Sequence, residues 1–300
     1  MATEYATFTA VDLSRLPAPA VVKALSYEQI LAEMIARLKT LLPSFDATVE
    51  SDPAVKILQV AAYREFLLRA DANDAARAVM PAYATGSDLD QLAALMGVAR
   101  KLLTPADAAT DTPAVYESDD DFRRRLILAP EGYSVAGPEG AYIFHTLSAA
   151  PDVLDASATS PSPGEVVITV LSRTGNGAAS AALLAAVDAY VSAETRRPMT
   201  DHVTVRSASI SEYRVEAMIR TFSGPDSAIV MAEAQKRLAA YVADNHRLGR
   251  DIVRSGIFAA LHVEGVQNVV LTAPAADVVL DRTMAPYCTG TAITFGGVGE

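Results

Sequence analysis

The sequence has few of the residues on which secreted, nucleic-acid-binding and membrane-bound proteins depend. Its single cysteine, Cys288, cannot form an internal disulfide, which fits a reducing compartment. The formal net charge of −11 provides no basic surface to attract nucleic acid or an anionic membrane. No apolar run is long enough to span a membrane, and the N-terminus lacks the basic and apolar regions of a signal peptide. We therefore expect neither a nucleic-acid partner nor a membrane partner.

Residue patterns for catalysis or metal binding are also scarce. No two of the four histidines (His145, His202, His246, His262) have the i, i+4 spacing of a helical zinc site, and one cysteine cannot build a cysteine-rich one. There is no G-x-S-x-G nucleophile motif. The chain has no tryptophan and only 6% aromatic residues, which leaves little surface for stacking on sugars or bases. The sequence thus predicts no catalytic residue, no metal site and no cofactor.

Hydrophobic residues make up 51% of the 300 positions, which is enough to fill the cores of two or three compact units. The fold class that we expect is α+β. An N-terminal helical region precedes two related small α+β units, each a short sheet with helices packed on one face. The expected boundaries are an arm over 1–25, a helical domain over 26–135, and α+β units over 136–211 and 212–300.

The first predicted helix begins after Ser26, a good N-cap, and ends before Pro43. Along it, apolar side chains recur at alternating spacings of four and three residues and form one seam: Tyr27, Leu31, Met34, Leu38 and Leu41. Such a seam packs either within the chain or against another subunit. Its residues are therefore candidates for a subunit interface.

A second, longer helix is predicted from Pro53 through the segment that ends at Gly86, with Ser51 or Asp52 as its N-cap. One face of this helix is apolar and comprises Ile57, Val60, Ala61, Leu68, Ala72, Ala75 and Val79. Arg64 and Asp71 fall within the same face, where unpaired charges are costly. Either this face is locally indented at the surface, or the two charges fix the register of a subunit contact.

The segment AYATGSDLDQLAALMGVAR (82–100) contains two nearby carboxylates, Asp88 and Asp90, that suggest an acid pair. Residues two apart on a helix point in different directions, so the pair cannot converge on one ion. Ser87 and Asp90 instead match a capping box, and Gly97 matches a C′ residue. We expect a structural role for all three. The segment ESDDDFRRRLILAP (117–130) likewise predicts a helix with acids first and arginines later, rather than a magnesium or phosphate site.

The second half of the chain contains an internal repeat. Residues 165–191 and 213–242 each read as an alternating strand, a glycine-containing turn and an alanine-rich helix. Residues 142–161 and 256–274 each read as a helix, a break and a strand. The helix–strand piece comes first in one unit and last in the other. The final segment CTGTAITFGGVGE lacks the lysine and the following helix of a phosphate-binding loop, so we expect a terminal strand that pairs with something.

Several of these segments, in this order, resemble the baseplate J-like family of contractile-tail phages over about residues 25–300. The resemblance is carried by Asn73, the AYATGSDLDQL block, Arg100, Glu117 with Asp119, and the AGPEGAY turn. It implies a structural wedge subunit of the tail baseplate, located in the virion and assembled in the host bacterial cytoplasm. Some longer relatives carry a β-rich insertion after the stretch matching Arg100, where this chain has only about fifteen residues before Glu117.

The implied partners are a second copy of the chain, a different wedge protein joined through a helical bundle, neighbouring wedges, and sheath-initiator or hub proteins. We hypothesise that the N-terminal helices form the permanent core of a wedge and that the C-terminal units form the joints of a ring around the tail tube. The alternative functions are a tail-associated cell-wall hydrolase and a carbohydrate-binding module. A hydrolase would need a convergent acid pair or a zinc site.

Overall fold

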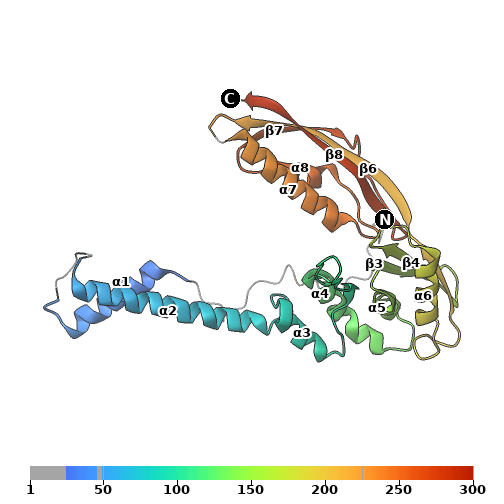
Figure 1. Cartoon of the computed structure of the whole chain (residues 1–300), viewed down its shortest axis with the longest axis horizontal. Coiled ribbons are helices and arrows are strands. Elements are labelled where there is room, and N and C mark those ends of the chain that lie inside the picture. Colours follow the sequence, from blue (N-terminus) through green and yellow to red (C-terminus); the bar gives the residue numbers. More distant parts are fainter. Residues whose placement is uncertain (1–24, 46–48, 50, 225, 300) are drawn as a thin grey trace. The chain divides into compact units, whose positions relative to one another are not determined.

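The computed structural model describes residues 25–45, 49, 51–224 and 226–299 (Figure 1). The backbone divides into two compact units. Of the described residues, those between 25 and 100 and those at 118–123 form the helical unit, and those at 101–117 and between 124 and 299 form the sheet unit. Apart from Leu25, the arm expected over residues 1–25 lies outside the described residues. None of the helices in the described part of the chain combines the length and hydropathy of a membrane span.

The helical unit is built on a hairpin of α1 (Tyr27–Leu41) and α2 (Pro53–Ala78), which pack against each other. Both N-termini begin as predicted. Ser26 Oγ accepts the amide of Gln29 at 3.2 Å, and Asp52 Oδ1 accepts the amide of Ala54 at 2.7 Å. The prediction that α2 continues to Gly86 is wrong. The helix ends at Ala78, shortly before Pro81, whose ring cannot continue an α-helix.

Helix α3 (Gly86–Ala94) does not start with the predicted capping box. Its N-cap is Thr85, whose side chain makes no capping hydrogen bond, and Ser87 lies inside the helix. The amide of Gly86 is instead accepted by Asp119 Oδ2 at 3.1 Å, from a residue 33 positions away. At the other end, Gly97 has a φ of +68°, its amide bonds Ala94 O, and the amide of Val98 bonds Ala93 O. These are the two hydrogen bonds of a Schellman ending with glycine at C′.

The sheet unit starts with a small antiparallel hairpin of β1 (Leu102–Thr104) and β2 (Val115–Tyr116). Helix α4 (Asp119–Leu128) follows, with three acids in its first turn and Arg125 in its last, as the sequence predicted. The division between the two units falls inside this helix, after Arg123. The 3-10 helix η2 (Ala129–Tyr133) then leads into the first α+β unit.

The first α+β unit contains five elements, in the order α5 (Glu139–Ala149), β3 (Val153–Thr159), β4 (Glu165–Ser172), α6 (Ala181–Val191) and β5 (His202–Ser207). Strand β4 is central, antiparallel to β3 and parallel to β5. Both helices contribute to one buried cluster with the sheet, represented by Ile143, Ile168 and Val187. One face of the sheet is therefore covered by the two helices.

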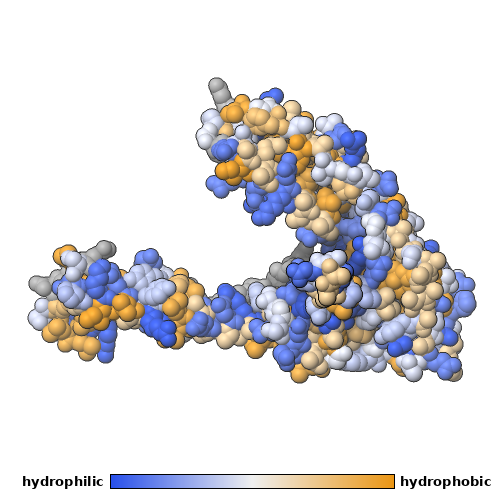
Figure 2. Space-filling view, in the orientation of Figure 1, coloured by the Kyte–Doolittle hydropathy of each residue, from blue (hydrophilic) through white to orange (hydrophobic). Residues whose placement is uncertain are grey.

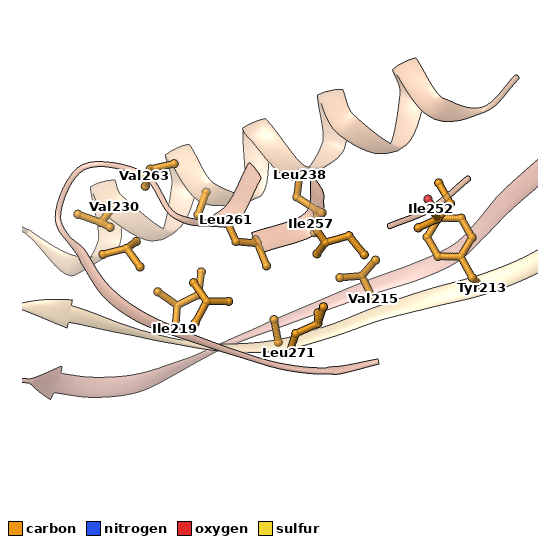
Figure 3. Packing of buried hydrophobic residues seen from close by; sticks show 14 residues of the cluster. Tyr213, Val215, Ile219, Val230, Leu238, Ile252, Ile257, Leu261, Val263 and Leu271 are labelled. Carbon is orange, nitrogen blue, oxygen red and sulfur yellow. The ribbon is translucent and has the colours of Figure 1, made fainter. Parts of the chain in front are cut away.

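The second α+β unit contains β6 (Ser209–Phe222), α7 (Ser227–Asn245), α8 (Arg254–Leu261), β7 (Val266–Ala273) and β8 (Met284–Gly299). Strand β6 is central, antiparallel to β7 and parallel to β8. Figure 3 shows Val230 and Leu238 of α7 pointing toward Val215 and Ile219 of β6, with Leu261 of α8 between the helix and the sheet.

The two sheets have the same arrangement in a permuted chain order. In each, the strand that precedes a long helix is central (β4 or β6), and the strand that follows a helix lies antiparallel to it (β3 or β7). A third strand, β5 or β8, lies parallel on the other side. The predicted α+β fold class, with helices on one face of each short sheet, is confirmed. The sequence repeat did not reveal β5.

Candidate assembly surfaces

The apolar face predicted for α2 is exposed to solvent along its whole length. Ile57 is 69% exposed, Val60 72%, Leu68 55% and Val79 67%, and the alanines at 61, 72 and 75 are exposed as well. Figure 2 shows hydrophobic side chains at the surface of the α1–α2 hairpin. Burying one such aliphatic side chain contributes about 1.5–3 kcal/mol. The face therefore has the composition of a buried contact but is not covered by any described residue.

The seam predicted on α1 is only partly covered. Tyr27, Leu31, Met34 and Leu38 are half-buried, and Leu41 is exposed. The one fully buried residue of this helix is Ile30, which the predicted seam left out. Ile30, Met34 and Leu38 follow each other at four-residue intervals, so the sequence did contain a signal for it. The structure places the seam at the border between the hairpin contact and solvent.

Arg64 and Asp71 are both exposed on α2 and lie close to the apolar face. They are seven residues apart, which is about 10 Å along a helix, so they do not reach each other. Among the ion pairs of the described residues, none joins the two. The two side chains therefore do not neutralise each other across the apolar face.

Arg100 joins three segments of the helical unit. Its guanidinium bonds Asp90 Oδ1 at 2.8 Å and Asp119 Oδ1 at 2.7 Å, and it lies 4.7 Å from the centre of the Phe122 ring. Partial burial opposes ionisation of Asp119, but hydrogen bonds from Gly86 and Arg100 outweigh it, so the pKa of this carboxyl lies below its ordinary value. Asp90 is therefore part of an ionic clamp, which corrects its predicted role in a capping box.

The arginines that follow on α4 also have partners within their own units. Arg123 donates to the carbonyls of Pro81 and Ala84 at 2.8 and 2.7 Å, and it pairs with Asp120. Arg124 pairs at 2.8 Å with Asp155, whose side chain is 1% exposed. These contacts leave the arginine run engaged inside the protein rather than arranged around a phosphate.

Glu117 and Arg125 form a buried ion pair in the sheet unit. Arg125 Nη2 lies 2.6 Å from Glu117 Oε2, and Nε donates to Oε1 at 3.2 Å. The side chains are 3% exposed for Glu117 and 6% for Arg125. Glu117 Oε2 also accepts the amide of Lys101 at 3.3 Å, and the Glu117 amide donates to the carbonyl of Lys101. The pair thus ties the last turn of α4 to the two ends of the β1–β2 hairpin.

The described residues contain no group of three or more His, Cys, Asp or Glu side chains that could hold a metal ion. A shallow hollow lies in the β1–β2 loop beside Asp107 and Asp111. The Asp107 carboxylate accepts the amide of Ala109 at 2.9 Å and the hydroxyl of Thr110 at 3.0 Å, and these bonds lower its pKa. This carboxylate therefore stabilises its own turn. The histidines differ from each other, since His145 is buried and His262 is exposed.

Three family descriptions match successive parts of the chain. The Baseplate J-like N-terminal domain matches residues 50–107, the Baseplate J-like central domain matches residues 134–207, and the Baseplate J-like protein C-terminal domain matches residues 213–295. Baseplate protein J of Escherichia phage P2 is 50% identical over 299 residues, in an alignment that covers 97% of this chain and 99% of that protein.

A solved structure shows a much weaker similarity. A chain in the cryo-EM structure of the anti-feeding prophage (AFP) baseplate, 6-fold symmetrised, is 14% identical, with a TM-score of 0.37. The match covers 59% of this chain and 44% of that one, so the chain spans less than half the length of that relative. A TM-score this low does not establish a shared fold.

Proposed function

Because this chain belongs to the Baseplate J-like family, we propose that it is a structural, non-enzymatic subunit of the baseplate of a contractile phage tail or tail-like particle. In this proposal it is a wedge subunit. Two copies and a different wedge protein associate through a helical bundle, and wedges close a ring around the tail tube. Sheath-initiator or hub proteins are further neighbours of the ring, and assembly takes place in the host cytoplasm.

The uncovered apolar face of α2 is the observation that carries this proposal. A helix of 26 residues that leaves Ile57, Val60 and Leu68 in water gains stability when another helix covers them. The half-buried seam of α1 borders the hairpin contact and supplies a second apolar surface for such a bundle. Large exposed apolar faces on a folded domain are typical of protein interaction sites.

The second part of the proposal assigns the ring joints to the α+β units. Their cores are complete within the chain, as the buried clusters around Ile168 and Ile219 show. They can therefore meet neighbouring wedges as preformed bodies. A ring that opens on sheath contraction needs contacts that switch between discrete states, which packed interfaces between preformed bodies provide.

Co-expression with the neighbouring tail proteins, followed by sizing of the complex, tests the bundle. We expect Val60→Asp to prevent the chain from joining the complex, since a carboxylate would be buried in an apolar contact. Ala239→Asp on α7 is the matched control, because it adds the same charge at an exposed position of a helix in the other unit. The bundle proposal fails if the Val60 variant enters complexes as well as the control does.

A further inference from the structure

The two three-stranded sheets of the sheet unit have four edge strands between them, and three of these edges are blocked or charged. At β3, Arg247 Nη1 donates to the carbonyl of Leu154 at 2.8 Å, and the Asp155 carboxylate accepts the amide of Leu248 at 3.0 Å. The Asp155 carboxylate is thus an inward-pointing charge on this edge, and the segment with Arg247 and Leu248 covers the edge with hydrogen bonds. Both features prevent an edge strand from pairing with another chain.

The edges at β5 and β7 are protected in other ways. Strand β5 is six residues long, and it carries Arg206. At β7, Arg254 Nη2 donates to the carbonyl of Leu271 at 3.2 Å, and Pro274 follows the strand directly. Short length, a charged side chain and a proline each disfavour the addition of a further strand.

The edge at β8 lacks these devices over most of its length. Its beginning is covered, because Gly249 donates to the carbonyl of Met284 at 2.9 Å and His246 Nδ1 lies 2.6 Å from that of Pro286. From Tyr287 to Gly299 there is no charged residue and no proline. Within the described part of the chain, no other strand lies along this side of β8.

Register irregularities divide this open edge and leave one regular segment. The pairing of β6 with β8 shifts between Tyr213 and Val215 and again between Ile219 and Thr221. Between these shifts, residues Thr291–Phe295 pair with Val215–Ile219 without interruption. Five residues is close to the mean length of a strand. Bulges twist an edge away from partners, so this segment is the part of β8 best suited to accept another strand.

We propose that Thr291–Phe295 pairs with the same segment of a second copy of this chain, antiparallel across a two-fold axis at Ile293. This pairing rests on the proposed ring-joint role of the α+β units and gives that role a surface. An uncharged strand brings no like charge to a copy of itself, whereas most segments of a chain with 20% charged residues would carry one. The pairing sets Thr291 opposite Phe295, a β-branched residue opposite an aromatic one, which stabilises antiparallel sheets. Two three-stranded sheets then form one six-stranded sheet.

A charge-swap experiment on the full chain tests this pairing. In the proposed register, Ala292 of one copy lies opposite Thr294 of the other copy, and both residues are exposed. We expect Ala292→Lys/Thr294→Lys to weaken self-association, measured by analytical ultracentrifugation, at least about tenfold, because lysines then face lysines. Ala292→Glu/Thr294→Glu should do the same, and an equimolar mixture of the two variants should associate again. Asn268→Lys/Thr272→Lys on β7 is the matched control and should associate as the unmodified chain does.

Several outcomes would overturn the proposal. These are a lysine variant that associates like the unmodified chain, a mixture that does not restore association, or an unmodified chain that stays single at its highest soluble concentration. If another tail protein occupies the edge instead, hydrogen exchange at 291–295 slows only when that protein is added. A failure of the proposed function gives a different result from a failure of the strand pairing. If the proposed function is wrong, the unmodified chain does not join complexes of tail proteins, although the lysine and glutamate variants still lose self-association and regain it when mixed.

Discussion

The buried ion pair between Glu117 and Arg125 allows a quantitative prediction about stability. Both side chains are almost completely removed from water, and two hydrogen bonds of 2.6 and 3.2 Å join them. Replacing Arg125 by methionine keeps much of the side-chain volume but leaves the Glu117 carboxylate buried without its counter-charge. Removing one partner of such a pair costs about 3–5 kcal/mol.

We therefore expect Arg125→Met to lower the free energy of unfolding by about 3–5 kcal/mol in urea titrations monitored by circular dichroism. At about 2–4 °C per kcal/mol for a unit of this size, the melting temperature should fall by roughly 6–20 °C. Glu117→Gln/Arg125→Met should lose less than Arg125→Met alone, because no unpaired charge remains and glutamine can still accept the Lys101 amide.

Arg237→Met provides the matched control for this variant. Arg237 pairs with Glu233 at 3.0 Å on α7, but the two side chains are 56% and 42% exposed. An exposed i, i+4 pair contributes at most about 0.5 kcal/mol, so this variant should unfold almost as the unmodified chain does. The reasoning would be refuted if Arg125→Met lost less than about 1 kcal/mol or no more than Arg237→Met.

Three further predictions follow from the helical unit. The pKa of Asp119 is lower in the folded state than in the unfolded state. The ionised Asp119 carboxylate therefore stabilises the fold fully above its unfolded-state pKa of about 4, and this stabilisation is lost as the pH falls through its folded-state pKa. The difference in unfolding free energy between the unmodified chain and Asp119→Asn should accordingly shrink below pH 4, and a difference that is constant from pH 5 to pH 2 would contradict this. Gly97→Ala should lower the free energy of unfolding by about 1–2 kcal/mol, because alanine disfavours the positive φ at this position. The control, Gly290→Ala, should be nearly neutral, since Gly290 has an ordinary φ and open space around it. Equal effects of the two substitutions would show that the glycine at the end of α3 contributes nothing to stability. If Arg64 and Asp71 fix the register of the bundle, a double-mutant cycle with alanine should show at least about 0.5 kcal/mol of coupling in partner binding, and strict additivity would remove that role.

Local sequence determined where the first two helices begin and which surface they leave apolar. The caps at Ser26 and Asp52 act within three residues of themselves, and the seven-residue face of α2 follows from helical geometry alone. The internal repeat was also visible, because strand and helix periodicities survive in both copies. For the same reason the sequence indicated the fold class, although it gave no sign of β5 as the third strand of its sheet.

The roles of the acidic residues depended on contacts between distant parts of the chain. The local sequence around Ser87 fits a capping box. In the structure, however, the Asp119 carboxylate accepts the hydrogen bond from the Gly86 amide, 33 residues away, and Asp90 forms an ion pair with Arg100. No periodicity contains that information, since a long-range pair is decided by which segments the fold brings together. Whether the α2 face is covered, and which sheet edges are blocked, likewise emerged only when the chain was folded, because burial is a property of neighbours and not of composition.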